Sequence, residues 1–254
     1  MPNRRPDGYV WQQPVQGGAA SSESHLAPHF RMTNVNPFPD DIFTEPENVD
    51  PDTLANLGPL RPLAGVWQSS KGIDLAPKAP GPERREYIER IDMQPIDPQA
   101  NGPQLFYGLR YHVHINTREE DITFHDQVGY WLWEASTGLV LQSLTIPRGQ
   151  IVLASGHAKP DDTTLVVSAT RGQTNYGICS TDFLEYAFRT DSYRLEITFN
   201  PDGSWSYVSD TMLRVRGQEE LFPHRDRNTL VKIAEPKPNP LMLIVSGRKF
   251  EQPD

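Results

Sequence analysis

The chain of 254 residues contains one cysteine, Cys179, which excludes an intramolecular disulfide and any metal cluster built on several cysteine thiolates. It has no apolar run approaching the roughly 20 residues that a membrane-spanning helix needs. The early arginines of the amino terminus are not followed by an apolar stretch, so this segment does not resemble a secretory signal peptide. These absences predict a cytoplasmic protein that does not associate with a membrane.

Positive charge is also scarce, because 24 Lys and Arg residues stand against 33 Asp and Glu residues, a formal net charge of -9. A chain of this charge does not hold nucleic acid by bulk electrostatic attraction. The sequence also lacks a Gly-rich phosphate loop before a helix, a G-x-S-x-G motif and an H-E-x-x-H motif. The common signatures of nucleotide binding, serine hydrolysis and zinc proteolysis are therefore missing.

Two flanking regions differ in composition from the middle of the chain. Residues 1–50 are rich in Pro, Gly, Ser, Asn and Gln and show neither a helical nor a strand period, which predicts an N-terminal arm. Residues 235–254 begin with E-P-K-P-N-P and continue with an apolar stretch too short to span a membrane. We expect this C-terminal tail to pack outside the main domain or against a second subunit in a homodimer.

Residues 51–234 are expected to form one β-barrel domain. Asp50 as a cap and Pro51 in the first turn predict a short helix that ends at Gly58 and Pro59. The period then changes to two, which predicts strands at 63–70, 86–93, 105–115, 124–134, 139–146, 150–156, 163–169, 193–199, 204–215 and 228–234, with 183–187 as a weaker candidate.

No helical pattern separates these strands, and most of the connections between them are short. This arrangement predicts an all-β fold, an up-and-down antiparallel β-barrel of about ten strands with the short N-terminal helix as a lid or plug. A β-sandwich is the alternative. A barrel of this size encloses one small ligand.

The strand F-H-D-Q-V-G-Y-W-L-W-E, residues 124–134, has an unusual distribution of polar residues. His125, Gln127, Gly129, Trp131 and Trp133 share one face, because side chains alternate along a strand. Neither face is uniformly apolar, which is typical of a strand that lines a ligand cavity. The alternative is that His125 faces solvent.

Three other features are candidates for a site. Gly65 and Trp67 form a Gly-x-Trp on the first strand, which places the indole either under a cavity or simply in the core. His224 follows a proline before the last expected strand, where a neutral imidazole either ligates a metal or lies on the surface. His112 and His114 share a strand face and could together chelate a metal, but the other residues of this face indicate the solvent side.

The order of P-L-A-G-V-W, H-D-Q-V-G-Y-W, T-G-L-V and a late histidine resembles the nitrobindin family over about residues 57–234. These proteins are heme-binding β-barrels related in shape to fatty-acid-binding proteins and lipocalins. The resemblance implies a heme b, with the iron held by one histidine and a second histidine on its open, distal side. The residues that it assigns are the proximal ligand His224, the distal residue His125, and the pocket residues Gly65, Trp67, Tyr130 and Trp131.

One departure from the family pattern concerns the first strand, which typically reads G-x-W-x-G-x-G. Ser69 and Lys71 stand here at the positions of the last two glycines. In the family, the glycines at these positions let a flat macrocycle approach the backbone. The resemblance implies nitric oxide binding, or isomerisation of peroxynitrite to nitrate, at a ferric heme. A heme-free carrier is the alternative, with Lys71 pairing with the carboxylate of a fatty acid or another small apolar ligand. A third hypothesis is an interaction module with a vestigial pocket.

Overall fold

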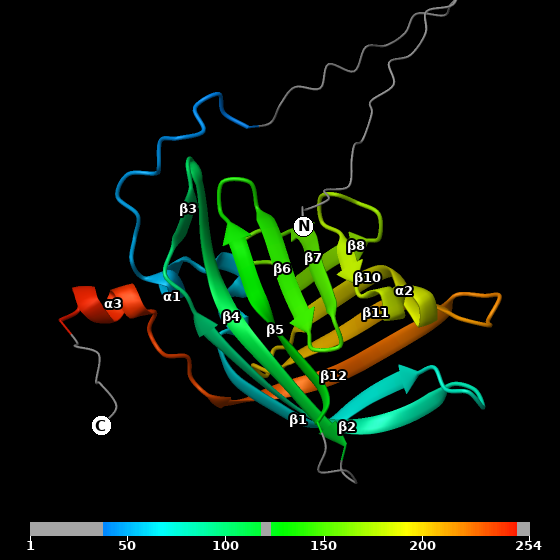
Figure 1. Cartoon of the computed structure of the whole chain (residues 1–254). Coiled ribbons are helices and arrows are strands. Elements are labelled where there is room, and N and C mark those ends of the chain that lie inside the picture. The colour runs from blue at the N-terminus through cyan, green and yellow to red at the C-terminus, as the bar shows by residue number, and fades with distance from the viewer. Residues whose placement is uncertain (1–37, 118–122, 248–254) are drawn as a thin grey trace, which may run out of the picture. The chain divides into compact units, whose positions relative to one another are not determined.

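Ten antiparallel strands form a closed β-barrel in the computed structural model, which describes residues 38–117 and 123–247 (Figure 1). The strands are β1 (Gly65–Ala76), β2 (Glu83–Pro95), β4 (Gln104–Thr117), β5 (Thr123–Glu134), β6 (Leu139–Ile146), β7 (Gln150–His157), β8 (Thr164–Thr170), β10 (Phe188–Phe199), β11 (Trp205–Val215) and β12 (Phe222–Ala234).

The strands follow one another around the barrel in chain order. The pairing of β1 with β12 joins the two ends of the chain's strand series, and β2 pairs with β4. The short strands β3 (Gln99–Asn101) and β9 (Ile178–Ser180) branch from this ring and pair with β4 and β7. The predicted up-and-down barrel is therefore confirmed, and the sandwich alternative is wrong.

The wall has one short ladder, between β7 and β8. These two strands share a single registered pair, Ser155 with Ser168. The first half of β7 pairs instead with β9, where Ile151 lies opposite Cys179. We call this place, residues 150–157 and 164–170 with the inserted β9, the β7–β8 seam.

A short helical segment closes one end of the barrel. It consists of α1 (Thr53–Asn56) and the 3-10 helix η1 (Gly58–Leu63), and three leucines from it, Leu57, Leu60 and Leu63, are fully buried in the core. The helix cap is Asp52, whose carboxylate accepts the N–H of Ala55 at 3.2 Å, and not Asp50 as expected. Asp50 instead accepts the N–H of Asp52 at 2.9 Å and so shapes the turn before the helix.

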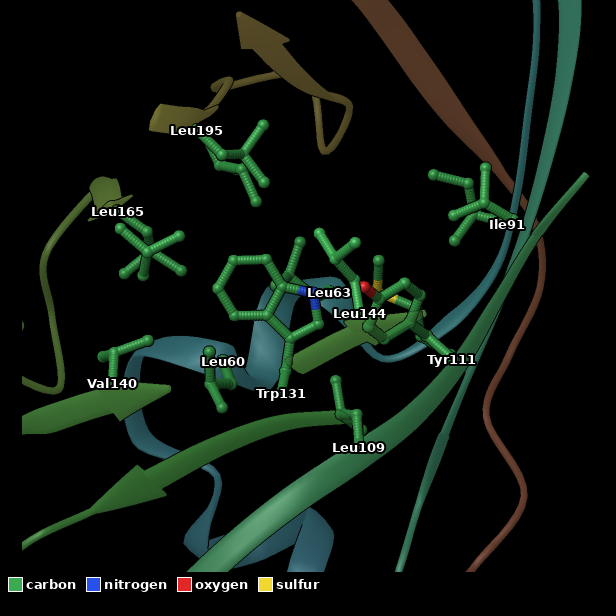
Figure 2. Close-up of a cluster of buried hydrophobic side chains, with 14 of the residues drawn as sticks. Leu60, Leu63, Ile91, Leu109, Tyr111, Trp131, Val140, Leu144, Leu165 and Leu195 are labelled. Carbon is green, nitrogen blue, oxygen red and sulfur yellow. The ribbon is translucent and has the colours of Figure 1, made fainter. Parts of the chain in front are cut away.

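The core fills the end of the barrel next to η1. The inward positions of β4 are buried at every second residue, as the period of two predicts, from Leu109 through Tyr111 and Val113 to Ile115. Figure 2 shows Trp131 of β5 among leucines contributed by several elements, including Leu60 and Leu63. The plug and the strands therefore share one hydrophobic core.

Two differences between the expected and the observed elements bear on the site. Residues 183–187 are not a strand but part of helix α2 (Asp182–Ala187), which has acidic residues in its first turn, where the helix dipole favours negative charge. The last strand begins at Phe222 rather than at residue 228, so His224 lies inside β12 and not before it. The sequence pattern hid this extension because the first half of β12 carries polar side chains on its inward face.

A final helix, α3 (Pro240–Val245), follows β12. No helix within residues 38–117 and 123–247 has the length and apolar character that crossing a membrane requires. Residues 1–37 of the expected arm and 248–254 of the expected tail lie outside the described residues. The division of the chain at residues 50 and 234 stays a prediction.

Asn239, which is 0% exposed, ties the segment before α3 to the plug. Its side chain donates to the carbonyl of Pro51 at 2.9 Å and to Asp97 at 2.8 Å, and it accepts the N–H of Thr53 at 3.2 Å. We expect Asn239→Ala to lower the free energy of unfolding by about 1–3 kcal/mol, because it removes three hydrogen bonds made by a fully buried side chain. Urea denaturation would measure this loss.

The matched control is Asn101→Ala, because Asn101 is exposed on β3. We expect this control to change the free energy of unfolding by less than about 0.5 kcal/mol. An equal effect of the two substitutions would contradict an anchoring role for Asn239.

Candidate functional site

The barrel encloses a cavity of about 740 Å³ at the end away from η1. This volume lies within the range of pockets that bind small molecules. Phe183 of α2 is 67% exposed and also lines the cavity, so the cavity reaches the surface beside α2. Figure 1 shows α1 and α2 on opposite sides of the barrel, which places the plug and the mouth far apart.

Much of the cavity wall is apolar. The apolar side chains come from strands all around the ring and include Ile91, Met93, Val113, Trp131, Leu144, Leu195 and Trp205. Trp131 is buried, and it both lines the cavity and belongs to the hydrophobic core drawn in Figure 2. The cavity therefore offers a dry surface to a flat or elongated apolar ligand.

Asp74, His224 and Asp226 form an acidic cluster on the wall made by β1 and β12. Asp74 and Asp226 are directly opposed in the β1–β12 ladder, and His224 lies two residues before Asp226 on the same face. The Nε2 of His224 donates to Asp74 Oδ1 at 2.7 Å and lies 3.9 Å from Asp226 Oδ2. Asp74 is 1% exposed, so this hydrogen bond is shielded from solvent.

The side chains of this cluster shift one another's pKa values. Burial disfavours the charged imidazolium, but the hydrogen bond from His224 to Asp74 and the charge of Asp226 outweigh it, so the pKa of His224 lies above its usual value. Burial raises the pKa of Asp226, and the carboxylate of Asp74 beside it raises this pKa further. His224 and Asp226 thus both hold their protons to a higher pH than they would in water.

A second polar network lies deeper, around the buried carboxylate of Glu89. Its Oε2 accepts from Tyr207 at 2.9 Å and from the side-chain amide of Asn228 at 2.6 Å. Asn228 accepts in turn from Ser69 at 2.7 Å, and the hydroxyl of Tyr87 lies 2.7 Å from that of Tyr207. Burial raises the pKa of Glu89 to about 7, although these hydrogen bonds oppose the shift.

The wall across the cavity carries His125 and a chain of amides and hydroxyls. His125 Nε2 lies 3.3 Å from Gln127 Oε1, and Gln127 donates to the hydroxyl of Tyr111 at 2.7 Å. Tyr193 donates to Gln142 at 2.9 Å. Burial lowers the pKa of His125, so this imidazole is neutral near pH 7.

The residues assigned from the sequence fall into two groups. His125, Trp131 and His224 line the cavity. Gly65, Trp67 and Tyr130 are not part of the described cavity lining.

Tyr130 and Trp67 lie in different environments. Tyr130 is 47% exposed on the outer face of β5. Trp67 is buried in the core, where its indole N–H donates to the carbonyl of Leu63 at 2.7 Å. Trp67 therefore belongs to the core at the plugged end, the simpler of its two interpretations.

A bulge in β1 changes which residues of the first-strand pattern face the inside of the barrel. The register shifts between Ser69 and Gly72, so that Lys71 is exposed and does not line the cavity. Gly72 takes the next inward position, where an added Cβ would lie 2.0 Å from the ring of Tyr87. One glycine of the expected pattern is thus present, displaced by one residue. The expected pairing of Lys71 with a ligand carboxylate does not agree with its outward position.

Three acidic residues of the cavity, Asp74, Asp226 and Glu89, were missed by sequence reasoning. The signal was present in β12, where His224, Asp226 and Asn228 occupy successive positions of one face. A polar residue at every inward position indicates a strand that lines a polar pocket. Pairing Asp226 with Asp74 additionally required the β1–β12 register.

The cavity residues fit a heme on two observations. The apolar wall provides a dry surface, and His224 presents a ring oriented by a buried carboxylate. A histidine that ligates a metal usually donates its other ring N–H to such a partner. Nε2 makes this hydrogen bond, so Nδ1 is the ring nitrogen that Asp74 does not contact.

Comparison with known proteins gives a family assignment. No curated protein matches the chain. Among solved structures, Rv2717c from M. tuberculosis is similar, with 19% identity, a TM-score of 0.49, and coverage of 71% of this chain and 96% of that protein. The family described as THAP4-like, heme-binding beta-barrel domain matches residues 56–232. The expected resemblance to nitrobindin-type barrels is confirmed. The chain therefore belongs to the family of THAP4-like heme-binding β-barrel domains.

Proposed function

We propose that the cavity holds a heme b with His224 as the axial ligand and His125 on the distal side, and that the protein binds nitric oxide or isomerises peroxynitrite to nitrate. The observation that carries this proposal is the hydrogen bond of 2.7 Å between His224 and buried Asp74 in a largely apolar cavity. Membership of a heme-binding family supports the cofactor. The resemblance to nitrobindins supports the two reactions.

Each residue has a distinct task in this proposal. Asp74 would hold the ring of His224 in place, and a neutral His224 would bind the iron of the heme. A bound heme supplies an iron centre with one position open to a small nitrogen oxide. Neutral His125 offers a hydrogen bond on the facing wall. Arg148, which also lines the cavity, attracts an anion such as peroxynitrite.

Hemin titration of the purified protein tests the cofactor and its ligand together. We expect a Soret band that saturates at one equivalent of hemin. His224→Ala is expected to shift this band and to weaken hemin affinity by more than about 10-fold. Loss of a residue that only hydrogen-bonds to a metal ligand already costs about that much, and loss of the ligand itself should cost more. Absorption spectroscopy measures both effects.

His112→Ala is the matched control, because His112 lies exposed on the outer face of β4 and binds Asp126. It is expected to bind hemin as the wild type does. A wild-type protein that shows no spectral change with stoichiometric hemin would refute heme binding. Wild-type spectra in His224→Ala would refute the assigned ligand.

A heme-free carrier of a fatty acid or another apolar carboxylate is the second candidate function. Lys78 and Arg148 line the cavity together with its apolar wall, and either cation pairs well with a ligand carboxylate. Displacement of a fluorescent fatty-acid probe, in protein free of hemin, distinguishes this function. The cavity itself argues against the third hypothesis, a vestigial pocket.

A further inference from the structure

The acidic cluster contains a buried oxygen atom without a hydrogen-bond partner. Oδ2 of Asp74 is fully enclosed and accepts no hydrogen bond, although Oδ1 of the same carboxylate accepts from His224. Leaving a buried carboxylate oxygen unpaired is costly, so such an atom calls for an explanation. A proton or a cation at this place would remove the cost.

Two carboxyl groups beside this oxygen share one ion-pair partner, His224. Asp226 lies opposite Asp74 in the β1–β12 ladder, and its Oδ2 lies 3.9 Å from His224 Nε2. Within residues 38–117 and 123–247, His224 is the only basic side chain that makes an ion pair with Asp74 or Asp226. A divalent cation would pair with both carboxylates at once.

The three side chains have the spacing of a metal site. One ligand atom from each of Asp74, His224 and Asp226 lies within 4.8 Å of the other two. The distances from His224 Nε2 to the two carboxylates are 2.7 Å and 3.9 Å. They bracket the separation of about 3.3–3.6 Å between ligands in a tetrahedral site with bonds of about 2.0–2.2 Å.

We propose that Asp74, His224 and Asp226 bind a divalent transition-metal cation in the heme-free barrel, with the remaining coordination position facing the cavity. One nitrogen and carboxylate oxygens suit Zn²⁺, Mn²⁺, Fe²⁺ or Co²⁺. The cation would replace the proton between His224 and Asp74 and would approach the unpaired Oδ2. A neutral imidazole has one free lone pair, so His224 serves either this cation or a heme iron, but not both.

Cation titrations of full-length protein, treated with a chelator and free of hemin, test the proposal. We expect one equivalent of Zn²⁺ to bind by calorimetry, and one equivalent of Co²⁺ to give the visible absorption bands of a site with low coordination number. Asp226→Asn and His224→Gln are expected to weaken Zn²⁺ binding at least tenfold. Circular dichroism establishes that each variant is folded. If one of the two variants does not fold, the other still tests the site.

His112→Ala serves as the control, because His112, His114 and Asp126 form a second imidazole and carboxylate group on the outer face. It is expected to bind Zn²⁺ as the wild type does. The proposal is overturned if the wild type binds no cation, or if only His112→Ala loses binding. Because these titrations contain no hemin, their outcome is independent of the heme proposal, and added Zn²⁺ should lower the affinity for hemin.

Discussion

Replacing Trp67 with alanine is expected to lower the free energy of unfolding by about 3–5 kcal/mol, as for other large buried side chains. Trp67 is 1% exposed and packs edge-on against Trp205, with 5.8 Å between the ring centroids. Its indole N–H also donates to the carbonyl of Leu63 in the plug. The substitution would therefore open a hole between the plug and β1 and would remove a buried hydrogen bond. Chemical denaturation measures the change.

Two further variants separate these contributions. Trp67→Phe keeps an aromatic ring but removes the indole N–H, so we expect a smaller loss that includes about 1 kcal/mol for the hydrogen bond. Tyr130→Ala removes a half-exposed aromatic from the outer face of β5 and is expected to cost well under the loss at Trp67. A loss below about 1 kcal/mol in Trp67→Ala would show that the indole is not part of the core.

Replacing Glu89 with glutamine is expected to change how stability depends on pH. The pKa of Glu89 is about 7 in the folded protein against 4.5 for an ordinary glutamate, so the folded state holds a proton that the unfolded state has lost. Stability therefore falls as the pH rises from about 4.5 through 7, and the full cost is on the order of 3 kcal/mol. Glutamine carries no such cost and still offers an oxygen to Tyr207 and Asn228.

The measurement compares urea denaturation of the wild type and Glu89→Gln at pH 5 and pH 8. We expect the variant to gain about 2–3 kcal/mol relative to the wild type between these two values. Glu86→Gln is the matched control, because Glu86 is exposed on the same strand and forms a surface ion pair. A difference between wild type and Glu89→Gln that does not change with pH would mean that Glu89 is charged throughout this range.

The barrel could be predicted from the sequence because its evidence is local. The alternation of Leu109, Tyr111, Val113 and Ile115 marks an inward face without any knowledge of the neighbouring strands. The mixed face of β5 likewise predicts a cavity, and His125 and Trp131 do line one. Helix α2 was missed because a six-residue helix has too few turns to show a period of 3.6.

The acidic cluster could not be predicted in the same way, because it depends on pairing between strands. Asp74 and Asp226 meet only because β1 and β12, at opposite ends of the barrel sequence, lie in a particular register. The bulge between Ser69 and Gly72 then decides which residues of β1 face inward. A motif read at fixed spacing cannot contain this information, which explains why Lys71 was expected at the cavity.

The β7–β8 seam is the place where neighbouring strands of the barrel are expected to separate most easily. Parting most neighbouring strands breaks a long row of backbone hydrogen bonds, whereas β8 and β7 share one registered pair. The seam lies across the ring from β1 and β12. We therefore expect a ligand wider than the cavity to part the strands at the seam before it parts β1 from β12, the strands that hold Asp74 and His224.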